Sequence, residues 1–360
     1  MSSEILIIGA GAAGLSTGLE LAQRGLRVAI LERGRAGGES TWAGGGILSP
    51  LLPWHYDERV NRLSEYSRSL LPEWVERLQS LSGQEAEWLD SGMLVLPPYD
   101  CDAAKSWCDA HAWPWSLRPA QDFLPRTGTW DALWLPGVSQ VRNPALIRVL
   151  RGAVQAAGVR LVEDAEVQGL TVSGGRVTGV ASTQGRFQAD AVVLTAGAWS
   201  GSLSGLDALA RRVYPVRGQM LLFKLDPGAL RCIVFKDGRY LIPRRDGHVL
   251  AGSTLEEVGF DKSTTTMARE DILAFAGGLL PGLNRSTLTM HWSGLRPGSP
   301  DNVPVIGRYP GLDNLFLNTG HYRYGVTMAP GSARLLASLL LAEAAPVDPD
   351  PYGLEAVAGA

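Results

Sequence analysis

The chain has 360 residues, which is long for one hydrophobic core and favours two closely linked domains. Hydrophobic residues make up 45% and charged residues 19%, as in a globular protein. The net charge is −3 and there is no basic block, so the sequence predicts no nucleic-acid-binding surface. Three cysteines without metal-ligand spacing or an even count predict no metal site and a reduced, cytoplasmic setting.

The sequence predicts neither a targeting nor a membrane segment. No basic region precedes the apolar run at the N-terminus, so we expect no signal peptide. The longest apolar stretch, Leu335–Ala345, contains Glu343 and falls short of the ~20 residues that span a bilayer. We therefore expect no membrane partner.

The N-terminal stretch has the pattern of a dinucleotide-binding βαβ unit. Ile5–Ile8 is a short apolar run, typical of a strand buried on both faces, and Gly9, Gly11 and Gly14 follow at GxGxxG spacing. Apolar residues then recur at helical spacing until Gly25, which favours a helix end there. In such units the glycines permit a tight turn, close approach of a pyrophosphate and helix–strand packing, and the helix N-terminus attracts phosphate.

A second apolar strand, Arg27–Leu31, ends at Glu32. A carboxylate at this place can accept hydrogen bonds from a ribose diol and would repel a 2′-phosphate, which disfavours NADP. The alternative is a glycine-rich structural turn beside a surface glutamate. Because the strand, helix, second strand and terminal acid all occur in order, the pattern favours the dinucleotide site.

A segment of small and hydroxyl residues, Glu39–Ile47, follows the second strand. Such a backbone can pass tightly against a large flat group, and Ser40 and Thr41 can bond phosphate or ribitol oxygens. The alternative is a flexible glycine loop. Cofactor contact is favoured because the segment leaves the strand end where such sheets bind ligands.

Beyond this unit, hydrophobic periodicity indicates further helices and strands. The predicted helices are Asp57–Leu81, Pro144–Gly158, Ala268–Leu280 and Thr327–Ala345. The predicted strands are Gly92–Leu96, Val159–Leu161, Glu166–Leu170, Arg176–Ser182, Ala189–Leu194, Met220–Lys224, Cys232–Phe235, Tyr240–Ile242, His248–Ala251, Leu288–Trp292 and Asn314–Leu317, with a loop and short strand over 301–307. Residues 211–257 predict an antiparallel meander, whereas residues 99–140 show no assignable pattern.

The strand Ala189–Leu194 leads into Thr195–Ser200, a turn of small residues. A strand followed by such a turn is typical of a return to the first sheet beside the dinucleotide. Taken alone, this pattern is weak.

Two arginines near the C-terminal end lie where a sheet would meet a ligand. Arg296 stands between apolar residues and a Pro-Gly turn, and Arg323 follows a predicted buried strand in a glycine-framed turn. Two converging guanidinium groups would hold a carboxylate, with each charge-assisted bond contributing about 1.5–3 kcal/mol. The alternative for either residue is a structural or surface ion pair. Tyr240 either closes the same pocket or is a cross-strand packing residue.

The turn at Tyr324-Gly325 and a helix start at Val326-Thr327 would direct N–H dipoles at a cofactor. The five histidines show no metal or triad spacing, and His321 is at most a cofactor neighbour.

These motifs together resemble the D-amino-acid oxidase superfamily of flavoproteins, and within it the glycine oxidases of the thiamine pathway. The resemblance runs over nearly the whole chain and rests on Gly9–Gly14 with Glu32, the segment 40–47, Thr195–Ser200, Tyr240–Arg244, Gly294–Gly298, Pro304–Gly307 and Gly320–Gly325. It implies an α/β fold: an FAD-binding Rossmann-like domain of the glutathione-reductase type and a second α+β substrate domain with a mostly antiparallel sheet. The division implied is 1–88, 141–203 and 289–360 for FAD, and 89–140 and 204–288 for substrate.

The resemblance also implies site residues. Arg296 and Arg323 would bind the substrate carboxylate and Tyr240 would line the pocket. The positions implied for the cofactor are Gly9, Gly11, Ala12, Ala13, Gly14, Glu32, Arg33, Ser40, Thr41, Gly45, Gly46, Ile47, Val167, Ala196, Gly197, His321, Tyr322, Arg323, Tyr324, Gly325, Val326 and Thr327. No cysteine lies near the C-terminal turn, so we expect non-covalent FAD. Departures at Gly44–Ile47, Leu255, Asn302 and Tyr324 leave the preferred amine open.

The sequence thus predicts an FAD-dependent oxidase of glycine or a small N-substituted or D-amino acid. Hydride transfer to the flavin needs orientation more than a protein acid or base, which agrees with the lack of a catalytic His or carboxylate pattern. The partners expected are a small amino acid, O₂ and further copies of the chain. Two alternatives stay open: a dehydrogenase that passes electrons to a quinone or partner protein, and a flavin-binding subunit without turnover.

Overall fold

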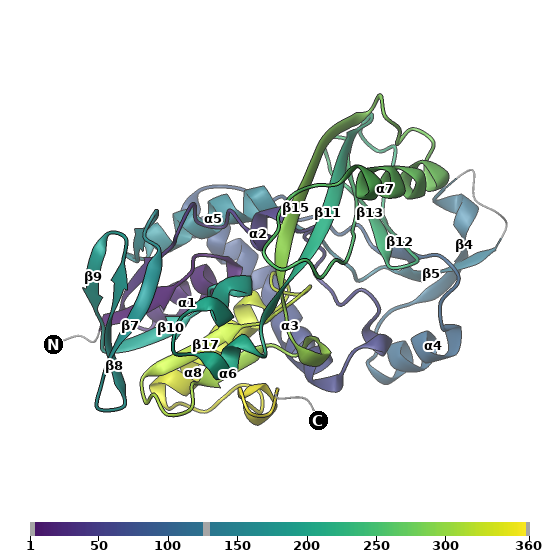
Figure 1. The fold of residues 1–360 in the computed structure, drawn as a ribbon. Helices are drawn as coiled ribbons and strands as arrows, with labels where there is room; N and C mark the ends of the chain where they lie inside the picture. The colour runs from purple at the N-terminus through teal and green to yellow at the C-terminus, as the bar shows by residue number, and fades with distance from the viewer. Residues whose placement is uncertain (1–3, 125–129, 358–360) are drawn as a thin grey trace.

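The chain, described here by a computed structural model over residues 4–124 and 130–357, is built on two large β-sheets that lie side by side (Figure 1). The first sheet has the strand order β16-β17-β10-β1-β2-β6. Its strands are β1 (Glu4–Ile8), β2 (Arg27–Leu31), β6 (Arg160–Val162), β10 (Ala191–Leu194), β16 (Val305–Arg308) and β17 (Leu315–Thr319). All neighbouring pairs are parallel except β16–β17, so the carboxyl ends of the parallel strands share one edge.

The second sheet has eight strands in the order β15-β11-β14-β13-β12-β3-β5-β4. These are β3 (Met93–Val95), β4 (Ser116–Pro119), β5 (Asp131–Leu135), β11 (Tyr214–Lys224), β12 (Ile233–Lys236), β13 (Arg239–Pro243), β14 (His248–Gly252) and β15 (Leu288–Gly298). All its pairs are antiparallel except β3–β12. The predicted fold class, with a parallel sheet and a mostly antiparallel second sheet, is confirmed.

A small third sheet and the helices complete the fold. The sheet contains β7 (Val167–Ser173), β8 (Arg176–Ser182) and β9 (Gly185–Gln188). The helices are α1 (Ala12–Gln23), α2 (Ser40–Ala43), α3 (Glu58–Ser82), α4 (Cys101–Ala110), α5 (Asn143–Ala156), α6 (Asp207–Ala210), α7 (Thr266–Leu279) and α8 (Ala329–Leu341). Short 3₁₀ turns are η1 (Pro53–His55), η2 (Ala120–Asp122), η3 (Gly197–Ser202), η4 (Pro300–Asn302) and η5 (Asp350–Tyr352).

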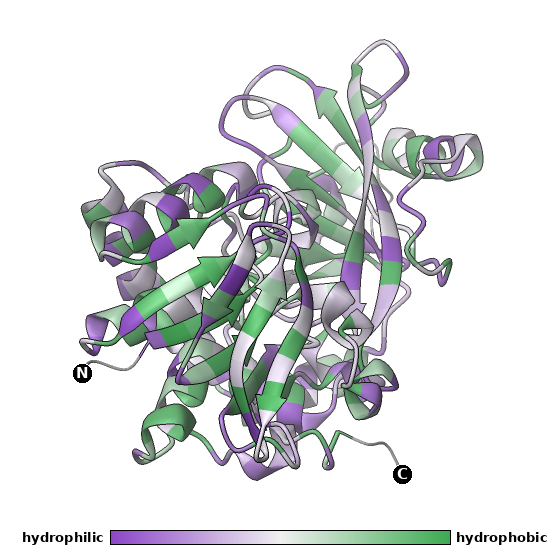
Figure 2. Cartoon of the chain, turned by 60° about the vertical axis from the view of Figure 1, so that its left-hand side comes forward, coloured by the Kyte–Doolittle hydropathy of each residue, from purple (hydrophilic) through white to green (hydrophobic). Residues whose placement is uncertain are grey.

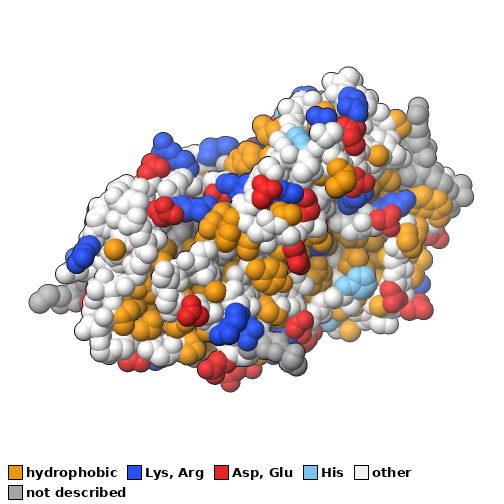
Figure 3. Space-filling view, viewed as in Figure 1, with side chains coloured by type: hydrophobic (Ala, Val, Ile, Leu, Met, Phe, Trp, Pro, Cys, Tyr) orange, Lys and Arg blue, Asp and Glu red, His pale blue; other side chains and the backbone are white. Residues whose placement is uncertain are grey.

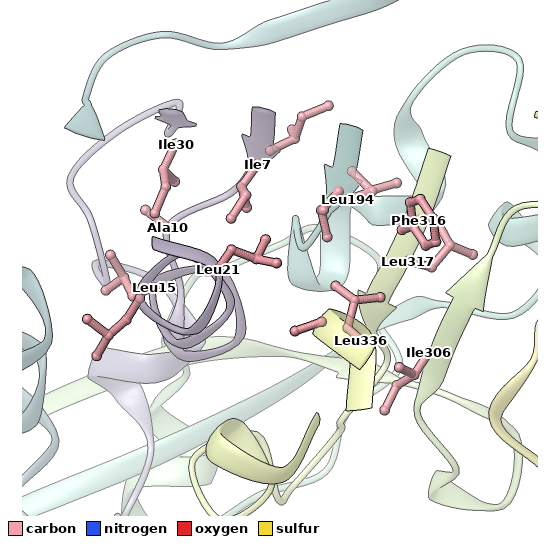
Figure 4. Close-up of a cluster of buried hydrophobic side chains, with 14 of the residues drawn as sticks. Ile7, Ala10, Leu15, Leu21, Ile30, Leu194, Ile306, Phe316, Leu317 and Leu336 are labelled. Atoms are coloured by element: carbon pink, nitrogen blue, oxygen red, sulfur yellow. The ribbon is translucent and has the colours of Figure 1, made fainter. Parts of the chain in front are cut away.

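The largest core lies between the first sheet and helices α1 and α8. Figure 4 shows Leu21 of α1 and Leu336 of α8 directed towards the strands that carry Ile7, Leu194 and Leu317. All five side chains are at most 1% exposed. Burying one such side chain contributes roughly 1.5–3 kcal/mol, so this apolar interface fixes the glycine turn after β1 against the sheet.

The distribution of hydrophobic residues follows the secondary structure in the described part of the chain. Figure 2 shows hydrophobic residues along the strands and hydrophilic residues on the connecting segments. On the face shown in Figure 3, acidic and basic side chains are interspersed rather than gathered into a field of one sign. No helix in the described part of the chain is both long enough and apolar enough to cross a membrane.

Several elements differ in extent from the prediction. The stretch 99–140, for which the sequence predicted nothing, supplies α4, β4 and β5, and its residues 125–129 lie outside the described part. Residues 40–43 of the glycine-rich segment form the short helix α2. Strand β15 continues to Gly298 and pairs with β11 in the second sheet, whereas the predicted division assigned residues 289–360 to the FAD-binding domain. The division itself stays a prediction.

Candidate active site

Two adjoining cavities open at the carboxyl ends of the parallel strands. The outer cavity, of about 450 Å³, runs from the end of β2 to η3 and β7. The inner cavity, of about 150 Å³, continues between the first sheet and the second. Gly11, Ser40, Thr41, Thr195 and Gly197 line both, so the two form one continuous trough. This is the edge at which open parallel sheets bind ligands.

The glycine turn that divides the cavities is closely packed. A Cβ on Gly14 would overlap the carbonyl oxygen of Gly9, and one on Gly9 would lie 2.7 Å from the carbonyl oxygen of Thr195. A Cβ on Gly11, in contrast, would meet only the Thr41 hydroxyl, at 3.4 Å. Gly9 and Gly14 are therefore required by packing, whereas the open side of Gly11 faces the trough.

The carboxylate of Glu32 is held rigidly in the outer cavity. Its two oxygens accept hydrogen bonds from the backbone N–H groups of Ala10, at 2.8 Å, and Gly34, at 3.0 Å. The side chain is 9% exposed and lines the cavity beside Arg33 and Val167. Each carboxylate oxygen keeps a further lone pair, so Glu32 can still accept bonds from a ribose diol.

Arg296 reaches the inner cavity from β15. Its Nη2 donates to the Ser253 hydroxyl at 2.6 Å and its Nη1 to the carbonyl of Thr254 at 3.2 Å. A Cβ on Gly218 would overlap the guanidinium, so the glycine on β11 leaves the space that the arginine fills. Tyr240 of β13 donates to the same Ser253 hydroxyl at 3.3 Å. Side chains from two strands, β15 and β13, thus converge on one hydroxyl.

Arg323 enters the inner cavity from the turn after β17. Burial lowers the pKa of its guanidinium, but the hydroxyls of Tyr56, Tyr324 and Tyr322 outweigh burial and raise it overall, so the group is charged. Within the described residues, no carboxylate lies within 4 Å of Arg296 or Arg323. The described residues that line the inner cavity include no Asp, Glu or Lys. The cavity is therefore cationic and suited to an anionic group.

His321 is the one imidazole among the described residues of the inner cavity. It is 3% exposed, its Nε2 has no hydrogen-bond partner there, and burial lowers its pKa to about 4. It is neutral at pH 7. A buried ring nitrogen without a partner is costly and is available to a ligand.

Hydrogen bonds between side chains and backbone groups tie the glycine-rich segment to its surroundings. The Thr41 hydroxyl accepts from the N–H of Ala12 at 3.0 Å, and Asn143 donates to the carbonyl of Thr41. Trp292 of β15 donates its ring N–H to the carbonyl of Ala43 at 3.1 Å. The segment is held between α1, α5 and β15 and is not a flexible loop.

Most of the predicted site residues line the trough. The outer cavity contains Gly9, Glu32, Arg33, Val167 and Ala196; the inner contains Ala12, Ala13, Gly45, Gly46, Ile47, Tyr240, Arg296, His321, Tyr322, Arg323, Tyr324, Gly325 and Val326; and Gly11, Ser40, Thr41 and Gly197 line both. Gly14 and Thr327 line neither. Gly14 packs α1 against the turn, and the Thr327 hydroxyl donates to the carbonyl of Ile47 at 3.2 Å.

Sequence reasoning missed several inner-cavity residues, among them Ser253, Gly218, Met220 and Asn143. They come from β11, the end of β14 and the start of α5. No local motif marks them: pairing in the second sheet places Ser253, Gly218 and Met220, and the packing of α5 places Asn143.

The trough fits the FAD that the resemblance implies. The open side of Gly11 gives a diphosphate room at the N-terminus of α1, the Glu32 carboxylate has free lone pairs for a ribose, and the unpartnered Nε2 of His321 lies in the inner cavity. The outer cavity has room for a nucleoside. None of the three cysteines lines either cavity, in agreement with non-covalent binding.

Comparisons with known proteins agree with this geometry. Residues 4–339 match the family model for FAD dependent oxidoreductases, DAO. The chain is 45% identical to a glycine oxidase of Pseudomonas aeruginosa over 358 residues, which cover 98% of each chain, and 43% identical to a glycine oxidase of Pseudomonas putida over 99% of each. It superposes on the crystal structure of glycine oxidase from Geobacillus kaustophilus with a TM-score of 0.90 at 28% identity, covering 98% of this chain and 99% of that one. The chain belongs to the DAO family of FAD-dependent oxidoreductases.

Proposed function

We propose that this protein is an FAD-dependent oxidase of glycine or another small amino acid. The observation that carries the proposal is the cationic inner cavity. Arg296 and Arg323 enter it, and among the described residues neither has a carboxylate partner within 4 Å. The inner cavity also opens directly onto the outer cavity, which has room for the nucleotide. The high identity to proteins named glycine oxidase supports the same substrate class.

The inner cavity limits the size of the substrate because it must also receive the isoalloxazine ring of FAD. It is bounded by Met220, Tyr240, Leu51 and Tyr324 as well as the two arginines. With the ring in place and the carboxylate on the guanidinium groups, the space that is left accepts a short amine with a small substituent at carbon or nitrogen.

The arginines orient the substrate and bias its protonation. Charge-assisted bonds from Arg296 and Arg323 fix the carboxylate, and the Ser253 hydroxyl holds Arg296 in place. The same positive charges and the low polarity of the cavity lower the pKa of a bound ammonium, so the neutral amine is the form that reacts. No described residue of the inner cavity is a carboxylate, and His321 is neutral, so the amine loses its proton before chemistry rather than to a protein base.

FAD, when bound, supplies the two-electron acceptor for a hydride from the α-carbon, and O₂ is the proposed oxidant that renews it with release of H₂O₂. The residues expected to hold it are Gly11, Glu32, Thr41 and His321. The remaining imino acid hydrolyses to an oxo acid and ammonia or an amine. We further propose that the protein acts in the cytoplasm as a homo-oligomer.

Anaerobic titration of the holoprotein tests the proposal. We expect glycine, sarcosine or D-alanine to bleach the flavin absorbance, and subsequent oxygen to restore it with stoichiometric peroxide. Bleaching that only a dye or quinone reverses would assign a dehydrogenase instead. A flavin that none of these amines bleaches would point to a subunit without turnover.

A further inference from the structure

A buried arginine lies directly behind the glycine-rich segment, outside both cavities. Arg244 follows β13 in the second sheet and is 7% exposed. Its Nη2 donates to the carbonyl of Gly45 at 2.7 Å, and its Nη1 donates to the carbonyl of Val141 at 3.0 Å and to the side-chain oxygen of Gln140. One guanidinium thus ties the second sheet to the segment that walls the inner cavity.

The positive charge of Arg244 has no carboxylate partner. Within the described residues, no Asp or Glu oxygen lies within 4 Å of it; the nearby carboxylates Glu87 and Asp246 pair with Arg142 instead. Burial and the neighbouring Arg142 lower its pKa to about 10, so the guanidinium is charged at neutral pH. A desolvated cation acts over a longer range than an exposed one, because little water screens it.

The bond from Arg244 also sets the direction of one peptide group. The carbonyl of Gly45 points to Arg244, and in a trans peptide the following N–H, that of Gly46, points the opposite way. Gly45 and Gly46 line the inner cavity, whereas Arg244 does not. No described residue accepts a hydrogen bond from the Gly46 N–H. This donor is therefore left for a group inside the cavity.

Only glycine at position 46 is compatible with this arrangement. Gly46 has a φ of +76°, and a Cβ there would overlap the carbonyl oxygen of Val141, which also accepts from Arg244. The glycine, the carbonyl and the arginine form one interlocked unit.

We propose that Arg244 is a positioning residue for the flavin. It directs the Gly46 N–H into the cavity that receives the isoalloxazine ring, and its buried charge raises the reduction potential of the bound FAD. A positive charge and a hydrogen-bond donor near the ring both stabilise the reduced form, which carries more negative charge. This inference needs the FAD of the family but no particular amine, so it stands apart from the proposed substrate.

The test is the midpoint potential of purified holoprotein, measured by equilibration with a reference dye. Arg244→Met keeps the volume of the side chain and removes the charge. We expect the equilibrium constant for two-electron reduction to fall about tenfold, which is about 30 mV. Arg245→Met is the matched control. Arg245 is the next residue, its side chain is 52% exposed, and it pairs with Glu85. This variant should leave the potential unchanged.

A second variant tests the charge without removing the arginine. Gln140→Glu is nearly isosteric and would place a carboxylate against the Arg244 guanidinium, so it should lower the potential in the same direction. If Arg244→Met does not fold, the potential of Gln140→Glu alone tests whether the charge of Arg244 acts on the flavin. A purely structural role would reduce thermal stability and FAD occupancy in these variants but leave the potential of the remaining bound FAD as in the wild type. That result would overturn the proposal.

Discussion

At the scale of single residues, the Ser253 hydroxyl is the point on which the proposed carboxylate clamp depends. It accepts from both Arg296 and Tyr240, and it is 9% exposed. Without it, the guanidinium keeps one bond to the Thr254 carbonyl and loses its fixed orientation.

We therefore expect Ser253→Ala to raise the KM for glycine about tenfold, the effect of one lost hydrogen bond to a charged group, and to change kcat much less. Steady-state oxygen uptake measures both constants. Ser182→Ala is a control of equal burial in the third sheet, where the hydroxyl meets only a nearby turn. An unchanged KM in Ser253→Ala would show that Arg296 is positioned without it.

His321 makes a prediction about pH. Burial lowers its folded-state pKa to about 4 from an ordinary value of 6.5, so below pH 6.5 the unfolded chain binds a proton that the folded chain does not. Stability from this group is therefore complete above pH 6.5 and is lost as the pH falls towards 4.

Between pH 7 and pH 5, the loss from His321 should be about 2 kcal/mol in the free energy of unfolding. Urea titration followed by tryptophan fluorescence measures it. His321→Asn, which cannot take up the proton, should lose about 2 kcal/mol less than the wild type over the same interval. Equal pH dependence in the two proteins would mean that the imidazole is protonated in the folded state.

At the scale of elements, the turn from β1 into α1 assigns different tasks to two glycines. Gly14→Ala would press a methyl group against the Gly9 carbonyl, and Gly11→Ala would meet only the Thr41 hydroxyl at 3.4 Å. The first should destabilise the protein by roughly 1–3 kcal/mol, as overpacking does. The second should leave the apoprotein stable but weaken FAD binding at least about tenfold, because the methyl group occupies the space for the diphosphate.

Thermal unfolding of the apoproteins and FAD titration separate these two effects. Gly34→Ala, at a position with no heavy atom within 4 Å of the added Cβ, serves as the control for both. If Gly11→Ala bound FAD as tightly as Gly34→Ala, the diphosphate would not lie at the N-terminus of α1.

The elements also show how far sequence reasoning reaches. The first βαβ unit and the strand before Thr195 could be predicted because buried strands of this kind are continuous apolar runs. In the βαβ unit, glycines at fixed spacing add a second signal. Arg296 and Arg323 stood out because glycine and proline frame them. Ser253 carried no signal, and Arg244 stood only at the end of the motif Tyr240–Arg244 without a role. The importance of both comes from pairing between β11, β13, β14 and β15, which local periodicity cannot reveal. In residues 99–140 the strands are only four and five residues long, too short for a clear period, and the ten-residue helix α4 was missed as well.

At the scale of the whole molecule, residues 254–265, here called the bridging segment, connect the second sheet to the outer cavity. Arg217 of β11, 4% exposed, anchors the segment through Glu256 and Asp261. At its far end Phe260 stacks on Trp199, with ring centroids 5.6 Å apart, and Lys262 pairs with Glu39 at 3.0 Å. Trp199 and Glu39 line the outer cavity, so this segment supports the wall around the nucleotide.

We expect Phe260→Ala to speed the release of FAD about three- to tenfold, the effect of losing one aromatic pair. Lys262→Met should do so more weakly, and it should also remove part of the salt dependence of release, because the Lys262–Glu39 pair is partly exposed. The recovery of FAD fluorescence on dilution measures the rate. Val258→Ala, in the same segment and 40% exposed, is the control. Equal release rates in Phe260→Ala and Val258→Ala would remove the role of the stack.

Arg296 and Arg323 are proposed to hold the substrate carboxylate so that a carbon–hydrogen bond faces the flavin. The decisive measurement is the rate at which glycine, or methylamine, which lacks the carboxylate, reduces the bound FAD without oxygen. In the wild type glycine should be much faster. Arg296→Ala should bind FAD normally, slow the reaction of glycine about 100-fold, and leave that of methylamine unchanged. Equal rates for glycine in the two proteins, or methylamine as fast as glycine in the wild type, would show that the guanidinium groups do not orient the substrate.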